Sequence, residues 1–270
     1  MIKAFKILYD QIKFFPLILR MVKYGDQSTY QNLFLGQIWK IVDPILQVSV
    51  YFFIFGLGLR GLQPGQTVLG YLAWLMIGMG IWRFMSAGIL SGSESIKKQI
   101  GLATKMKFPL SILPSISIAS AGWIFVTLES VSIIFIILNG DGFSPHWYAS
   151  FYFMFAAVIF SYSFALLNSS ILILIPDYIS ILRLVMSMGM WVSGVIFDLD
   201  QMQSSIGNIL RLSPFYYIVY GLRDTIYQPT PLFARHFINS TIIFWSVVVI
   251  FMITGSYFHE KFKRDFVEYL

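Results

Sequence analysis

Charged side chains inside apolar stretches are the first candidates for chemistry in this sequence. Lys40, Arg83 and Arg183 each interrupt a run of mostly apolar residues. Charges within membrane segments are costly, so they are functional candidates by default. Two interpretations are open for these cations. They form a collar that meets an anionic headgroup entering from the inner leaflet, or they snorkel to lipid phosphates, with Lys40 paired to nearby Asp43.

Glu129 is a fourth charge within an apolar stretch, and it lies deeper along its stretch than the three cations. It either relays protons in an ion-driven carrier or is hydrogen-bonded within a helix bundle, to Thr127, Ser130 or a neighbouring helix. Its position along the stretch does not match that of Arg83, so we predict no ion pair between the two.

Motifs of the common catalysts are missing from the sequence. There is no Cys, the three His lie far apart, and neither H-E-x-x-H nor G-x-S-x-G occurs. No G-x-x-x-x-G-K-[ST] loop is available to cradle ATP phosphates. We therefore expect no catalytic residue, metal or cofactor in this chain, and energy for uphill transport must come from elsewhere.

The composition places these charges in a membrane protein. Hydrophobic residues make up 57% of 270 residues, charged residues 12%, and the mean hydropathy is +0.73. A soluble domain carries about 25% charged residues, and disorder needs low hydrophobicity. The net charge of +6 indicates anchoring to anionic lipid at the cytoplasmic surface rather than nucleic-acid binding.

Hydrophobic patterning predicts an all-α integral membrane protein. Residues 2–24 form an amphipathic helix that lies in the interface, and Pro16 either kinks it or starts a second helix. We treat 1–34 as this interfacial unit and 35–270 as one transmembrane domain. Six apolar stretches are long enough to be transmembrane helices. They are 35–59, 68–90, 110–138, 147–174, 178–197 and 237–257.

Basic residues outside these stretches set the orientation. They gather in the N-terminal region, the connection between the second and third stretches, and the C-terminal tail. By the positive-inside rule, both termini and this connection are cytoplasmic in a multi-pass protein of the cell (plasma) membrane. The residues are Lys3, Lys6, Lys13, Arg20, Lys23, Lys97, Lys98, Lys105, Lys107, Lys261, Lys263 and Arg264.

Two connections carry structure of their own. Ser91-x-x-Glu94 is a capping-box pattern, and it predicts a short cytoplasmic helix over about 93–107. This helix either docks a soluble partner, which we favour, or anchors at the inner surface. Its candidate contact residues are Ile96, Lys97, Lys98, Ile100 and Lys105.

The connection 198–236 is too long to be structureless. We predict two short re-entrant or interfacial helices on the outer face, separated by Ser213-Pro214.

Aromatic residues cluster in the first apolar stretch. Tyr51, Phe52 and Phe55 are either lipid-facing packing residues or the lining of a conduit on which a sugar polymer slides. There is no internal repeat of the kind that secondary carriers show. We therefore expect the path to be built by dimerisation.

Five motifs in order resemble the membrane subunit of bacterial ABC-2 type exporters, in the polysaccharide-export group, and most closely wall teichoic acid export permeases of Gram-positive bacteria. The motifs cover essentially the whole chain. They are Leu35-Gly36-x-x-Trp39 with Asp43-Pro44, Phe53-x-Phe55-Gly56-Leu57-Gly58, Lys105-Met106-Lys107-Phe108-Pro109-Leu110-x-Ile112-Leu113-Pro114, Ser213-Pro214-Phe215-Tyr216 with Tyr220-Gly221-Leu222-Arg223-Asp224, and Tyr257-Phe258-His259-x-Lys261-Phe262-x-x-Asp265-Phe266.

This resemblance implies a homodimer with two copies of a separate ABC ATPase subunit, which binds ATP and Mg. The helix after the second span would be the coupling helix. The outer pair of helices would be a gate that includes Phe215, Tyr216, Tyr217 and Arg223. The implied substrate is a lipid-pyrophosphate-linked teichoic acid. Open alternatives are export of another polysaccharide or a small drug, and a proton-coupled carrier that uses Glu129.

Overall fold

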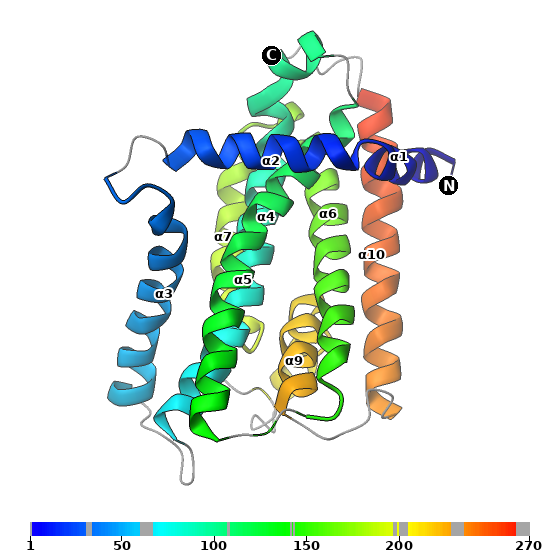
Figure 1. Cartoon of the computed structure of the whole chain (residues 1–270). Coiled ribbons are helices and arrows are strands. Elements are labelled where there is room, and N and C mark those ends of the chain that lie inside the picture. The colour runs from blue at the N-terminus through cyan, green and yellow to red at the C-terminus, as the bar shows by residue number, and fades with distance from the viewer. Residues whose placement is uncertain are drawn as a thin grey trace.

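A computed structural model describes residues 2–30, 34–59, 67–106, 109–140, 142, 144–196, 199, 205–227 and 235–262. Throughout these ranges the chain forms helices and no strand. Long helices run side by side as a bundle, and α1 and α2 lie across one end of it (Figure 1). The predicted all-α fold is confirmed.

Five helical segments are long and apolar enough to cross a membrane: Gly36–Gly56, Val68–Gln99, Leu110–Asn139, Trp147–Leu174 and Asn239–Phe262. They belong to α3 (Trp39–Tyr51) with η1 (Gly36–Ile38) and η2 (Phe52–Leu59), α4 (Val68–Met106), α5 (Leu113–Asn139) with η3 (Leu110–Ile112), α6 (Ser150–Leu174) with η4 (Trp147–Ala149), and α10 (Arg235–Phe262).

The sixth predicted span is a shorter helix. α7 covers Tyr178–Val192, which is 15 residues, or about 22 Å against a hydrocarbon core of about 30 Å. It ends before Gly194, where a positive φ of 76° turns the chain. Only glycine adopts this conformation freely, so the prediction that the helix extends to residue 197 was wrong.

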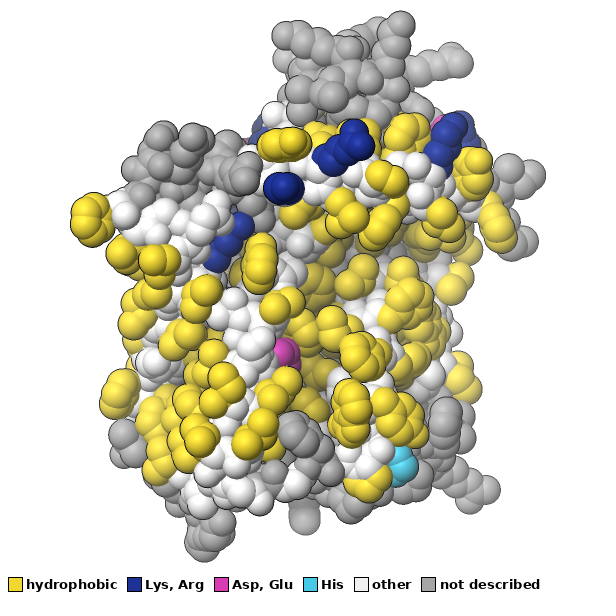
Figure 2. All heavy atoms as spheres, viewed as in Figure 1, with side chains coloured by type: hydrophobic (Ala, Val, Ile, Leu, Met, Phe, Trp, Pro, Cys, Tyr) yellow, Lys and Arg dark blue, Asp and Glu magenta, His cyan; other side chains and the backbone are white. Residues whose placement is uncertain are grey.

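The N-terminal segment is two helices, as the proline predicted. α1 spans Ile2–Lys13 and α2 spans Phe15–Tyr30, with Pro16 in the first turn of α2, where its missing N–H is tolerated. Figure 2 shows Lys and Arg side chains gathered at this end and hydrophobic side chains over the rest of this face. The first turn of α1 and the last turn of α10 lie at the same end (Figure 1).

α4 is one continuous helix of 39 residues. The predicted separate helix at about 93–107 is therefore wrong, because Ser91-x-x-Glu94 lies inside α4. The neighbouring serines do not cap a new helix but bond back to the preceding turn. Ser93 Oγ donates to the carbonyl of Ile89 at 2.7 Å, and Ser95 Oγ donates to that of Gly92 at 2.6 Å.

Burial separates two central helices from three peripheral ones. Within the most apolar 18 residues of each segment, 67% of the residues are buried in α4 and in α6. The share is 28% in α5 and α10 and 17% in α3. At the end opposite α1 and α2 lie α8 (Ser205–Leu210) and α9 (Pro214–Tyr227). The two short helices are present, with Pro214 as the first residue of α9, and their place on the outer face remains a prediction.

Candidate transport path and coupling elements

Arg83 joins α4 to α3. Its guanidinium lies 3.4 Å from Asp43 Oδ2 and also donates to Gln47 Oε1. Gln47 Nε2 in turn donates to both carboxylate oxygens of Asp43, at 3.0 and 3.1 Å. One of our two interpretations paired Asp43 with Lys40, and the structure pairs Asp43 with Arg83. The sequence missed this partner because the two residues lie on different helices.

The other two cations have other partners. The ammonium of Lys40 lies 5.8 Å from the centre of the Trp123 ring on α5. Arg183 Nη2 donates to Glu94 Oε1 at 2.8 Å, and the second oxygen of Glu94 accepts from Lys98. Arg83 and Arg183 thus pair with different carboxylates, those of Asp43 and Glu94. The collar remains a prediction.

The three predicted lining aromatics differ in burial. Phe52 is buried, with its ring centre 6.0 Å from that of Tyr71. Tyr51 and Phe55 are half-buried and stack on each other at 6.4 Å. Phe55 also meets Trp191 of α7, edge to face at 5.9 Å. Tyr51 and Phe55 therefore keep partly open rings on the α3 and α7 side.

The half of α4 that lies toward α1 and α2 contributes to a small apolar cluster shared with α2, α5 and α6. Ile96 is fully buried in a small cluster with Ile18, Leu113 and Ile173, so its side chain positions α4 rather than offering a contact to a partner. Lys97 is half-buried and Lys98 is exposed. The side chains of Ile100 and Lys105, which were predicted to contact a partner, lie outside the described residues.

The predicted outer-gate aromatics are packed inside the bundle. Phe215 meets Trp82 and Phe160, each edge to face at 5.1 Å. The Tyr217 hydroxyl bonds the hydroxyls of Tyr152 and Thr241, both at 2.9 Å.

Tyr216, the third of these aromatics, is buried and stacks on Tyr220 at 5.1 Å. The α9 aromatics are thus packed into the bundle on the side away from α1 and α2, and their role as a gate remains a prediction.

Arg223 is the most heavily bonded side chain of this region. It is 4% exposed and donates to three backbone carbonyls: Nε to Trp74 at 3.1 Å, Nη1 to Gly194 at 2.6 Å and Nη2 to Val195 at 2.5 Å. Its guanidinium carbon also lies 3.5 Å from the centre of the Trp74 ring.

A side chain at Gly78 would displace this guanidinium, because a Cβ there would lie 1.8 Å from Nη2. We define Arg223, Trp74, Gly78, Gly194 and Val195 as the outer clamp. It ties α9 to the first half of α4 and to the turn after α7. In the sequence, Arg223 stood out as a charged residue in an aromatic-rich segment. The backbone carbonyls that accept its hydrogen bonds could not be predicted from the spacing of residues.

Glu129 is buried, with 9% exposed. Ser132 Oγ donates to its Oε2 at 3.3 Å, whereas Ser130 Oγ donates to the Val126 carbonyl. Hydrogen bonding of Glu129 within the bundle is confirmed, but its partner Ser132 lies two residues beyond the expected Ser130.

The chain matches known transporters over most of its length. The model of the ABC-2 type transporter family matches residues 16–227, so the chain belongs to this family of multi-pass membrane transport proteins. Among curated proteins it is similar to the O-antigen export system permease protein RfbA of Klebsiella pneumoniae (20% identity, 99% of this chain and 100% of the relative). It is equally similar to that of Myxococcus xanthus (22% identity, 99% of each). The chain is therefore an ABC-2 permease related to polysaccharide export subunits.

Proposed function

We propose that this chain is the permease subunit of an ATP-driven exporter that moves a lipid-linked, phosphate-rich polymer of the teichoic acid class to the outer face of the cell membrane. Phosphates buried singly in hydrocarbon carry a prohibitive desolvation cost. The polymer therefore needs a hydrated, protein-lined route, while its prenyl tail stays in lipid. Family membership supports the export class, and the cations Arg83 and Arg183 support an anionic cargo.

The unbroken α4 carries the proposal. One helix connects the outer clamp to the exposed Lys98 at its other end. A separate ATPase that binds ATP and Mg would push on the inner end, with the basic end of the bundle cytoplasmic. Because no flexible joint interrupts α4, a tilt at that end is carried to α9, which closes the outer end.

A homodimer completes the path in this proposal. Of the five long apolar segments, the one that contains α3 is the least buried, with 17% of its most apolar 18 residues buried. Tyr51 and Phe55 are only half-buried there, and the Asp43 side chain of the Arg83 pair is 53% exposed. A second copy facing α3 and α7 would enclose both the aromatic rings and the cations between the two protomers.

The test is the ATPase activity of the chain reconstituted with its ATPase subunit. Lipid-linked poly(ribitol phosphate) or poly(glycerol phosphate) should stimulate hydrolysis more than a neutral lipid-linked glycan does. Arg83→Gln combined with Arg183→Gln should lower this stimulation, whereas the surface control Lys261→Gln should not. Equal stimulation by the neutral glycan would rule out a preference for an anionic polymer. It would not contradict the proposal that the chain is an exporter subunit.

The proton-carrier alternative makes a different prediction for Glu129. Glu129→Gln keeps the shape of the side chain but cannot carry a proton. Our proposal expects ATP-dependent export by this variant at the wild-type rate, with or without a proton gradient. Export that follows the proton gradient in the wild type and is lost in Glu129→Gln would favour the carrier instead.

A further inference from the structure

A cavity of about 860 Å³ opens beneath α1 and α2. Its walls come from α4, α5 and α6, and α1 and α2 form its roof; we call it the α5–α6 groove. Trp123, Val126 and Phe155 line it and are each about half exposed. The groove therefore opens sideways, toward the surroundings of the bundle. Figure 2 shows a hollow in this mostly apolar face, with basic side chains at its upper end and an acidic side chain visible at mid-height.

The lining excludes a polar cargo. Among the described residues that line it, the only polar side chains apart from the Trp123 indole are those of Gln11, Ser115 and Tyr162. Gln11 Nε2 donates to the Tyr162 hydroxyl at 2.8 Å and to the Ser111 carbonyl at 3.0 Å, while Ser115 Oγ donates to Gln11 Oε1 at 2.6 Å. These groups bond one another beneath the roof, so the groove offers an occupant only apolar contact.

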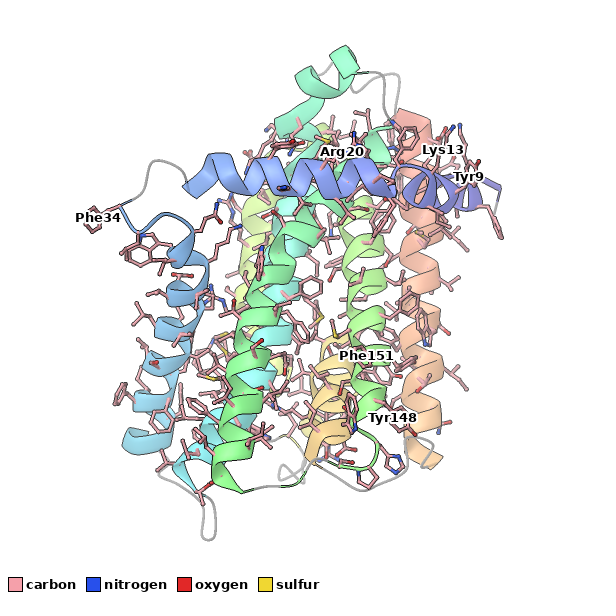
Figure 3. All side chains as sticks on the ribbon, in the orientation of Figure 1. Tyr9, Lys13, Arg20, Phe34, Tyr148 and Phe151 are labelled. Carbon is pink, nitrogen blue, oxygen red and sulfur yellow. The ribbon has the colours of Figure 1, made fainter. Side chains whose placement is uncertain are left out.

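Positive charge lies beside the groove on the same side as its roof. The Lys40 ammonium is 5.8 Å from the ring centre of Trp123, which lines the groove. Lys13 and Arg20 lie on the roof helices themselves (Figure 3). A molecule with an apolar chain and an anionic head therefore matches both parts of the site.

We propose that the α5–α6 groove holds an acyl chain of an anionic phospholipid, whose phosphate lies beside Lys40. A resident lipid fits better than the exported polymer, because the groove contains no charged lining residue and no polar route along its length. It also fits better than a void, since apolar cavities of this size next to lipid are filled. The lipid would fasten α1 and α2 to the bundle. This site does not depend on which polymer is exported.

The test uses Trp123 as the reporter. The full chain is placed in phosphatidylcholine vesicles that contain a small fraction of brominated phosphatidylglycerol, or the same fraction of brominated phosphatidylcholine. Subtracting the fluorescence of Trp123→Phe isolates the signal of Trp123. We expect brominated phosphatidylglycerol to quench this signal at about fivefold lower fraction, the preference expected from one basic residue at the membrane surface.

Two pairs of variants locate the lipid. A Cβ at Gly122 meets nothing within 4 Å, so Gly122→Leu should fold while it fills the groove and abolishes the preference. Ser246→Leu, at an exposed position of α10 that does not line the groove, should keep it. Lys40→Gln should bring the ratio of the two quenching fractions close to one, so that the preference for phosphatidylglycerol is lost. Lys261→Gln should leave this ratio unchanged.

Three outcomes would overturn the proposal. Equal quenching by the two brominated lipids would mean ordinary surrounding lipid. Absence of quenching by either would mean that protein, such as a second copy of the chain, covers this face. A preference that survives both Gly122→Leu and Lys40→Gln would place the anionic lipid elsewhere. The Lys40→Gln result decides alone if Gly122→Leu fails to fold.

Discussion

The two ends of α4 are held in opposite ways. At the outer end, the buried Arg223 donates to three backbone carbonyls and stacks on Trp74. At the inner end, Glu94 pairs with Arg183, whose side chain is 62% exposed, and with Lys98, which is 66% exposed. A buried guanidinium cannot exchange its partners for water, whereas exposed ion pairs exchange readily. The comparison shows that the polar contacts at the clamp end of α4 are buried, whereas the ion pairs at the other end are exposed; under our proposal, the second end responds to the ATPase subunit.

The largest expected effect comes from breaking the outer clamp. Arg223→Met leaves the carbonyls of Trp74, Gly194 and Val195 without this donor, and hydrogen bonds to charged groups contribute about 1.5–3 kcal/mol each. We expect a loss of roughly 3 kcal/mol or more of unfolding free energy in detergent. Arg223→Lys should lose less, because it keeps the charge but not the fork of donors. An unchanged stability of Arg223→Met would remove the distinction between the two ends of α4.

Gly78→Ala tests the same clamp from its other side. The added methyl would lie 1.8 Å from Arg223 Nη2, so the guanidinium must shift away from its acceptors. Overpacking of this kind costs typically about 1–3 kcal/mol. Gly122→Ala is the matched control, because it meets nothing and should stabilise its helix by up to about 1 kcal/mol. The melting temperature should fall for Gly78→Ala and rise for Gly122→Ala. A change in the same direction for both variants would contradict the placement of Gly78 in the outer clamp.

The Arg83–Asp43 pair should give an intermediate effect, because it is neither fully buried nor fully exposed. A double-mutant cycle of Arg83→Gln and Asp43→Asn should yield a coupling energy of about 0.5–3 kcal/mol, the range found for residues in contact. Strictly additive losses would show that the pair does not join α3 to α4.

The smallest expected stability change is at the inner end. Arg183→Gln removes an exposed ion pair, and such pairs contribute about 0–1 kcal/mol. Unfolding should therefore hardly change, and high salt should reduce the difference further. A loss as large as that of Arg223→Met would mean that both ends of α4 are fixed alike.

Local patterns predicted the helices well. The break at Pro16 and the start of α9 at Pro214 follow from the missing N–H of proline, which acts on its own neighbours. The apolar stretches predicted the five long helices for a similar reason, because membrane length sets the length of an apolar run.

Features that depend on distant contacts were not predictable in the same way. Ser91-x-x-Glu94 looked like a helix start, but the serines beside it bond backwards and Glu94 points to Arg183. Arg223 looked like a gate residue, although its acceptors are supplied by segments far away in the sequence. Charge and motif position alone do not reveal which helices meet.

The most direct test of the account is the distance between spin labels at the two ends of α4. The chain has no Cys, so Val68→Cys with Lys98→Cys labels α4 alone, at a separation of about 45 Å for an unbroken helix. With the ATPase subunit bound and ATP added, we predict that this distance stays the same, while the distance from residue 98 to a label at Lys261→Cys on α10 changes. An ATP-dependent change in the 68–98 distance would show that α4 breaks between its ends and does not carry motion to the outer clamp.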